Sequence, residues 1–126
     1  MSKIKKEIER LMDEPTTTDS GASSTFRFPP DFVGFQGHFP TGKVLPGACQ
    51  IQCVISTIEK SLMKHVVLKQ IVLGKFFAPV FPDEKIICTV SGLDDNAAEF
   101  ICKSRISRGE EKIADIRLQI CTGEII

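Results

Sequence analysis

His38 is the side chain in this sequence best suited to acid–base chemistry, and it lies shortly before the dipeptide Pro46-Gly47. An imidazole titrates near neutral pH, so His38 can act as a general base. Pro46 is expected to open a helix, because proline fits the first helical turn. The N–H groups of that turn have no intrahelical acceptor and can bind a developing negative charge. Alternatively, His38 only hydrogen-bonds the backbone and holds the loop.

The five cysteines are a second group with chemical potential: Cys49, Cys53, Cys88, Cys102 and Cys121. Their number is odd and no C-x-x-C pair occurs, which argues against a disulfide framework or a structural zinc site. We therefore expect free, mostly buried thiols in a reducing compartment. Cys49 and Cys53 are four residues apart and would share a helix face, so a redox pair or a nucleophile stays open as an alternative.

The N-terminal half supplies the elements that must position these groups. Apolar residues at helical spacing predict a helix over residues 3–13, which Pro15 ends. Residues 16–24 are small and polar and indicate a linker, and residues 25–28 alternate as a strand that Pro29-Pro30 stops. Residues 31–47 form a loop rich in Gly, Pro and Phe. Such an apolar loop must pack against something, which is often a sign of function.

The rest of the chain is expected to contain one long helix followed by strands. The stretch 48–64 lacks Gly and Pro and is apolar on most sides at its start, which suits a helix enclosed by a sheet. Strands are predicted over residues 66–77, 85–93, 97–107 and 112–121, and the last three look like an antiparallel meander. The sequence therefore predicts an α+β fold, in which a curved antiparallel sheet wraps around one long central helix.

Two separated motifs resemble a known enzyme family. The run Gly37-His38-Phe39-Pro40, then Leu45-Pro46-Gly47 and a helix, resembles the signature of the bacterial 3-hydroxyacyl-acyl carrier protein dehydratases. Residues 31–40 are similar to the dehydratase-like subgroup associated with aryl polyene lipid synthesis. Downstream, residues 74–82 (GKFFAPVFP) resemble that family's Lys-Phe-x-x-Pro-Val-x-Pro strand. The resemblance covers roughly residues 25–121. It implies a hotdog fold, usually a dimer with two sites at the subunit interface.

The resemblance also implies roles for individual residues. His38 would take a proton from C2 of a 3-hydroxyacyl thioester, and the N–H of Gly47 would stabilise the enolate oxygen. Gln52 would be a positioning group. Phe35, Phe39 and the apolar face of the helix could line an acyl tunnel, and Pro46 and Cys49 are further candidate substrate-binding residues. No metal and no organic cofactor is implied. The expected domain division is an N-terminal helix and polar linker over residues 1–22 and a hotdog domain over residues 23–126.

Gln52 is the main departure from the family pattern, which places Glu or Asp at this helix position. An amide orients a hydroxyl or a water by hydrogen bonds but does not donate a proton at neutral pH. Glu59 is seven residues further on, about 10 Å along the helix, which is too far to replace this acid. Two alternatives to a dehydratase therefore stay open. One is a non-catalytic acyl-thioester-binding protein or silent subunit beside an active homologue, and the other is a hotdog thioesterase.

Composition and charge limit the partners. Lys plus Arg and Asp plus Glu both number 16, and this balance argues against a nucleic-acid binder. No apolar run approaches the roughly 20 residues that span a bilayer, and the charged N-terminus has no signal core. We therefore expect a cytoplasmic protein without a membrane span. The expected partners are an acyl carrier protein or coenzyme A thioester and a second copy of the chain, because pairing removes open sheet edges.

Overall fold

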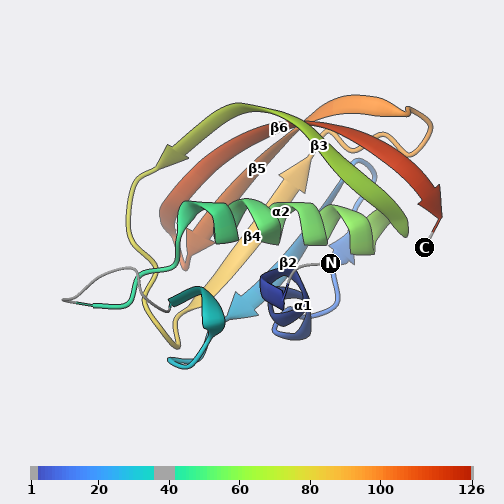
Figure 1. Ribbon diagram of the computed structural model, residues 1–126. Coiled ribbons are helices and arrows are strands. Elements are labelled where there is room, and N and C mark those ends of the chain that lie inside the picture. Colours follow the sequence, from blue (N-terminus) through green and yellow to red (C-terminus); the bar gives the residue numbers. More distant parts are fainter. Residues whose placement is uncertain (1–2, 36–41, 126) are drawn as a thin grey trace.

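One curved antiparallel sheet enclosing a central helix forms the body of the molecule (Figure 1). The computed structural model describes residues 3–35 and 42–125. Six strands pair in the order β1-β2-β4-β5-β6-β3, and every neighbouring pair is antiparallel. The elements are α1 (Lys3–Arg10), β1 (Thr16–Thr17), β2 (Gly21–Arg27), the 3-10 turn η1 (Val33–Phe35), α2 (Gly47–Leu62), β3 (Lys64–Phe76), β4 (Lys85–Ser91), β5 (Glu99–Arg108) and β6 (Glu111–Ile125). The predicted α+β architecture is thus confirmed.

The sheet forms because apolar and polar side chains alternate along its strands. In β6, Ile116, Leu118 and Ile120 are fully buried in the core, whereas Arg117 between them is exposed. This period of two places one side of each strand in the core and the other in solvent. Strands β4, β5 and β6 are neighbours in both sequence and space, which confirms the predicted meander.

Helix α2 lies along the inner face of the sheet (Figure 1). It carries both Gly47 and Gln52, two of the predicted site residues. Its sheet-facing side buries Cys53, Val54 and Ile58 completely. The helix begins after Pro46 and ends at Met63, whose left-handed backbone (φ 55°) lets its N–H bond the carbonyl of Glu59 at 2.8 Å. The predicted helix over residues 48–64 is confirmed, with both ends shifted by only one or two residues.

The segment expected to be a linker, residues 16–24, instead contains β1 and the first part of β2. Thr16 pairs with Ser23, and Gly21 pairs with Ser91 of β4. Small residues are needed here for close packing rather than for flexibility. A Cβ atom on Gly21 would lie 2.4 Å from the carbonyl oxygen of Val90, so only glycine fits. The domain boundary at residue 22 stays a prediction.

A chain of phenylalanine rings ties the aromatic loop to the core. Phe28 packs on Phe32 with ring centroids 4.7 Å apart, and Phe32 meets Phe35 edge to face at 5.6 Å. Phe26 stacks on Phe28 at the end of β2. All four rings are at most 4% exposed. The expectation that this loop packs against something is therefore confirmed for residues 28–35.

Candidate active site at the start of the central helix

The first turn of α2 presents backbone donors that the helix itself does not use. The N–H groups of Cys49 and Gln50 both bond the carbonyl of Pro46, at 3.0 and 3.2 Å. The N–H groups of Gly47 and Ala48 have no acceptor among residues 3–35 and 42–125, and no side chain caps the helix. Since α2 is 16 residues long, its dipole adds to the attraction of these donors for negative charge.

A pocket of about 310 Å³ opens at this helix end. It is lined by Val44, Leu45, Gly47, Gln50, Phe76, Phe77, Ala78 and Pro79. The N–H of Leu45 bonds the carbonyl of Val80 at 2.9 Å and so holds the approach to the helix against the chain after β3. A Cβ atom on Gly47 would lie 3.0 Å from the ring of Phe76. Glycine at this position therefore lets an aromatic ring lie directly against the helix start.

The other residues predicted for the site have different surroundings. His38 and Phe39 lie outside the described residues. Phe35 and Cys49 are each 4% exposed, and both belong to the core cluster. Pro46 is half-buried and directly precedes Gly47. The structure thus brings Gly47 to the pocket, has Pro46 directly before it, and buries Phe35 and Cys49 in the core, while the contact of these residues with substrate stays a prediction.

The thiols fit the expectation of free, mostly buried cysteines. All five are free, and only Cys121 is not buried. Burial raises the pKa of Cys49, and it raises the pKa of Cys88 to about 12. A thiol that stays protonated is a poor nucleophile. Among residues 3–35 and 42–125, nothing around Cys49 or Cys53 activates either thiol for the redox or nucleophilic role left open above.

Gln52 is half-buried and belongs to a chain of hydrogen bonds. Its Nε2 donates to Oγ of Ser56 at 3.0 Å, and that hydroxyl donates to Oε2 of Glu9 in α1 at 3.0 Å. Gly47 is five residues earlier, which corresponds to a rotation of about 140° and a rise of about 7.5 Å along the helix. Within one chain, residues 47 and 52 therefore lie on different sides of α2, so Gly47 and Gln52 face different directions.

Glu59 has a structural role that accounts for its position on the helix. It is 4% exposed, and Oε1 forms an ion pair with Nζ of Lys5 at 3.0 Å. Its Oε2 accepts the backbone N–H of Val66 at 2.8 Å. Both carboxylate oxygens are thus engaged in holding α1 and β3 to the end of α2. This agrees with the expectation that Glu59 does not replace the missing acid at position 52.

Three pocket residues were not singled out from the sequence. Gln50 is 3% exposed; its Nε2 reaches the carbonyl of Leu45 at 3.5 Å, and its Oε1 has no hydrogen-bond partner in the described part of the chain. A polar side chain within the apolar start of a buried helix was the available signal. Phe76 and Phe77 lie inside the quoted second motif, but the packing of Phe76 on Gly47 and the position of Phe77 in the pocket require the fold.

Within residues 3–35 and 42–125, no group of three or more His, Cys, Asp or Glu side chains is arranged to hold a metal ion. None of the described helices is both long enough and apolar enough to cross a bilayer.

Comparison with known proteins decides the family. The model of the ApeI-like family, described as ApeI dehydratase, matches residues 14–115 of the chain, which is most of its length. The chain belongs to the ApeI-like dehydratase family. The FabZ 3-hydroxyacyl-acyl-carrier-protein dehydratase of Ehrlichia chaffeensis is 32% identical to this ApeI-like chain over 79 residues. That match covers 57% of the chain and 55% of the FabZ protein, so the chain spans about half the length of this curated relative.

Solved structures show that the ApeI-like chain has the predicted hotdog fold. The dehydratase heterocomplex ApeI:P from Xenorhabdus doucetiae superimposes with a TM-score of 0.72 at 21% identity, over 87% of this chain and 93% of that one. A hypothetical thioesterase with coenzyme A from Streptococcus pneumoniae gives a TM-score of 0.72 at 8% identity, over 97% and 95% of the two chains. At these identities the likeness shows the fold alone.

Proposed function

We propose that this chain acts on 3-hydroxyacyl thioesters and dehydrates them to the trans-2-enoyl form. The observation that carries this proposal is the start of α2, where the N–H groups of Gly47 and Ala48 have no acceptor among the described residues and Gly47 lines a pocket of about 310 Å³. The membership in the ApeI-like dehydratase family supports it. A thioester carbonyl bound at these donors gains its strongest hydrogen bonds when charge develops on the oxygen.

The proposed reaction divides its steps among three residues. His38 takes the proton from C2, and the electron pair moves toward the carbonyl oxygen, which the N–H of Gly47 stabilises. The C3–O bond then breaks, the C2–C3 double bond forms, and the proton that His38 took from C2 passes, directly or through solvent water, to the departing hydroxide, which leaves as water. Gln52 holds the 3-hydroxyl by a hydrogen bond but supplies no proton. Because lost general acid catalysis typically costs about 10²–10⁴ in rate, we expect slow turnover.

We propose that the working unit is a homodimer. Gly47 and Gln52 point to different sides of α2, so a ligand bound at Gly47 of one copy meets Gln52 only from a second copy. Strand β3 pairs with β6 alone among the described strands, which leaves its other edge open for such pairing. A site between two copies would use both residues.

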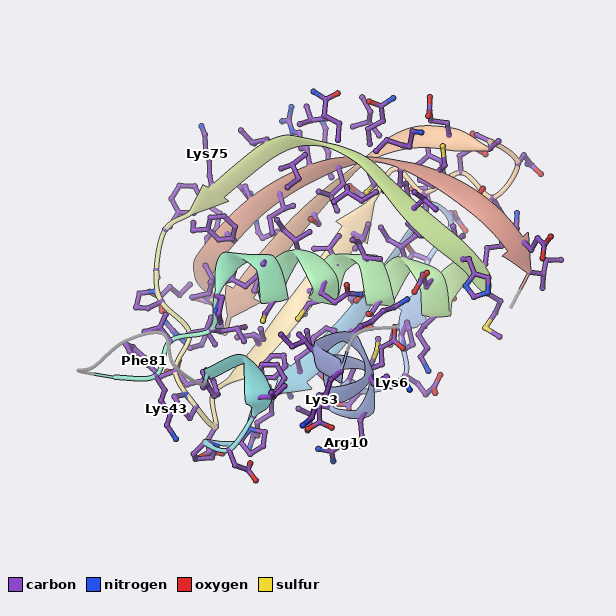
Figure 2. All side chains as sticks on the ribbon, in the orientation of Figure 1. Lys3, Lys6, Arg10, Lys43, Lys75 and Phe81 are labelled. Carbon is purple, nitrogen blue, oxygen red and sulfur yellow. The ribbon has the colours of Figure 1, made fainter. Side chains whose placement is uncertain are left out.

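The proposed substrate carrier is an acyl carrier protein or coenzyme A. Figure 2 shows Lys43, Lys75 and Phe81 at the end of the molecule where α2 begins, which is the end that holds the pocket. Cations around a pocket entrance favour an acidic partner or a phosphate group. Lys69 is a further candidate cation, whereas Lys64, Arg105 and Arg108 already form ion pairs with carboxylates of the chain.

A second candidate function is acyl-thioester binding without catalysis, either alone or as the silent subunit of a heteromer. The amide at position 52 favours it, because the position lacks a proton donor. A thioesterase is the third candidate, in which water attacks the carbonyl bound at Gly47. It would release a free thiol, whereas dehydration leaves the thioester intact.

The test compares the native chain with Gln52→Glu and His38→Ala, in dehydration of a 3-hydroxyacyl carrier protein and in hydration of the enoyl form. Turnover by the native chain that His38→Ala abolishes would support the dehydratase. A silent native chain that Gln52→Glu activates would support the binding function. Release of free thiol would identify a thioesterase. If neither the native chain nor Gln52→Glu turns over either substrate, the proposed reaction is contradicted.

A further inference from the structure

The hydrogen-bond chain from Gln52 through Ser56 to Glu9 joins the central helix to the N-terminal helix. Ser56 is 0% exposed, so water does not compete for its hydroxyl. Helix α1 runs close to α2 (Figure 1), and its residue Ile8 is buried in the core. Figure 2 shows Lys3, Lys6 and Arg10 on the side of α1 that points away from α2. Glu9 therefore belongs to the face of α1 that packs on the central helix.

The direction of each hydrogen bond in this chain follows from the groups themselves. A carboxylate only accepts hydrogen bonds, so the hydroxyl of Ser56 must donate its single proton to Glu9. The oxygen of Ser56 can then only accept from Gln52, and the amide must turn its NH₂ group toward Ser56. The carbonyl oxygen Oε1 of Gln52 is left at the other end of the amide, without a hydrogen-bond partner among the described residues.

We infer that Glu9 and Ser56 are positioning residues that fix the amide of Gln52 with its carbonyl oxygen toward the ligand. This inference rests on the proposed function. It makes position 52 a hydrogen-bond acceptor of fixed direction, and hydrogen bonds in a connected chain strengthen one another. A ligand group that donates a hydrogen bond is therefore favoured at this position, and a group that only accepts is disfavoured.

The 3-hydroxyl of an acyl chain is such a donor, whereas a 3-oxo group only accepts and an unsubstituted chain does neither. A single neutral hydrogen bond corresponds to about three- to tenfold in affinity. The chain is therefore expected to bind the 3-hydroxyacyl ligand more tightly than the other two by that factor. The same arrangement explains how an amide can retain the hydroxyl without protonating it.

Glu9→Lys tests the inference by reversing the direction of the hydrogen bonds that run from Gln52 through Ser56 to residue 9. An ammonium group only donates, so Ser56 would accept from Lys and pass its own proton to Oε1 of Gln52. The NH₂ group would then face the ligand. Affinities are measured by calorimetry for the pantetheine amides of 3-hydroxyhexanoate, 3-oxohexanoate and hexanoate. In Glu9→Lys both a 3-oxo and a 3-hydroxyl group can accept from this NH₂ group, so the ratio of 3-oxo to 3-hydroxy affinity should rise about three- to tenfold, toward equal affinities.

Controls separate positioning from a merely structural role. Glu7→Lys makes the same charge change on α1 at a residue whose carboxylate pairs with Arg10 instead, and it should leave the ratio unchanged. If Glu9→Lys does not fold, Ser56→Ala frees the amide and should bring the three affinities closer together. An equal loss for all three ligands in Glu9→Lys, with no change in ratio, would overturn the inference.

A second measurement keeps the inference distinct from the proposed function. In the native chain, the side-chain amide protons of Gln52 should show nuclear Overhauser contacts to the β protons of Ser56, and Glu9→Lys should remove them. If these contacts are found but no ligand binds, the proposed function fails and the positioning stands. If they are absent in the native chain, the positioning is wrong whatever the ligand does.

Discussion

The side-chain nitrogen of Lys5 lies 3.0 Å from Oε1 of Glu59, and this ion pair ties the N-terminal helix to the end of the central helix. The side chains are 20% and 6% exposed, so the pair is largely shielded from water. The other oxygen of Glu59 accepts the N–H of Val66, where β3 begins. One carboxylate therefore joins α1, α2 and β3.

Lys5→Ala should destabilise the fold, because it leaves the buried carboxylate of Glu59 without its cation. Breaking a fully buried pair costs about 3–5 kcal/mol, and the partial exposure of Lys5 reduces our expectation to about 1–3 kcal/mol. Urea denaturation measures the change. Lys6→Ala, at an exposed position on the same helix, is the control and should change the unfolding free energy by at most about 0.5 kcal/mol.

Alkaline pH should destabilise the native state through its buried thiols. Burial raises the pKa of Cys88 to about 12, and an unfolded thiol titrates near 8.5. Above about pH 8.5 the unfolded thiol loses its proton while the folded one keeps it, so the unfolding free energy falls with rising pH by about 1.4 kcal/mol per unit for this thiol. No such effect is expected below that pH.

Urea unfolding of the native chain and of Cys88→Ala at pH 7.5 and pH 10 measures this slope. The variant should lose about 2 kcal/mol less than the native chain between the two conditions. The chain has no tyrosine, so no phenol titrates in this range. Equal losses in both chains would show that Cys88 ionises as readily in the folded state as in the unfolded state.

Gly47→Ala should weaken ligand binding in the pocket without destabilising the fold. The added Cβ would lie 3.0 Å from the ring of Phe76, which is 46% exposed and therefore has room to move. Alanine also suits a helix start better than glycine does. We expect the melting temperature to stay within a few degrees, whereas affinity for the acyl-thioester falls about tenfold or more as the ring moves into the pocket. Gly42→Ala, with no atom within 4 Å of the new Cβ, should change neither.

The sequence was sufficient for most of the fold because its signals were local. The alternation of Ile116, Leu118 and Ile120 with polar residues predicted β6, although the strand ends four residues later than expected. The uninterrupted run after Gly47 predicted α2 to within two residues at each end. Strand β1 and the start of β2 were missed, because Gly21 and its small polar neighbours have the composition of a linker. Their strand conformation depends on pairing with β4, which is far away in the sequence.

The candidate site was less predictable, because its contacts depend on tertiary structure. The motif around Pro46 and Gly47 indicated the free N–H groups of the helix start. The position of Phe76 against Gly47 required the arrangement of β3 beside α2. In the same way, nothing local in the sequence connects Glu9 with Ser56, because 47 residues separate them. Hydrogen bonds between distant segments follow from packing and not from spacing.

The open edge of β3 should mediate the proposed dimer. This strand carries Ile71 and Val72, which are 47% and 43% exposed, on a long edge that no described strand covers. Apolar edges of this kind are normally paired or blocked by charge.

Light scattering should give twice the mass of one chain for the native protein, and one chain mass for Ile71→Lys combined with Val72→Lys. Because the two side chains are adjacent along the strand, they cover both faces of the edge. Ile101→Lys, at a 53% exposed position on an inner strand, should remain dimeric; a monomeric native protein would contradict the shared site.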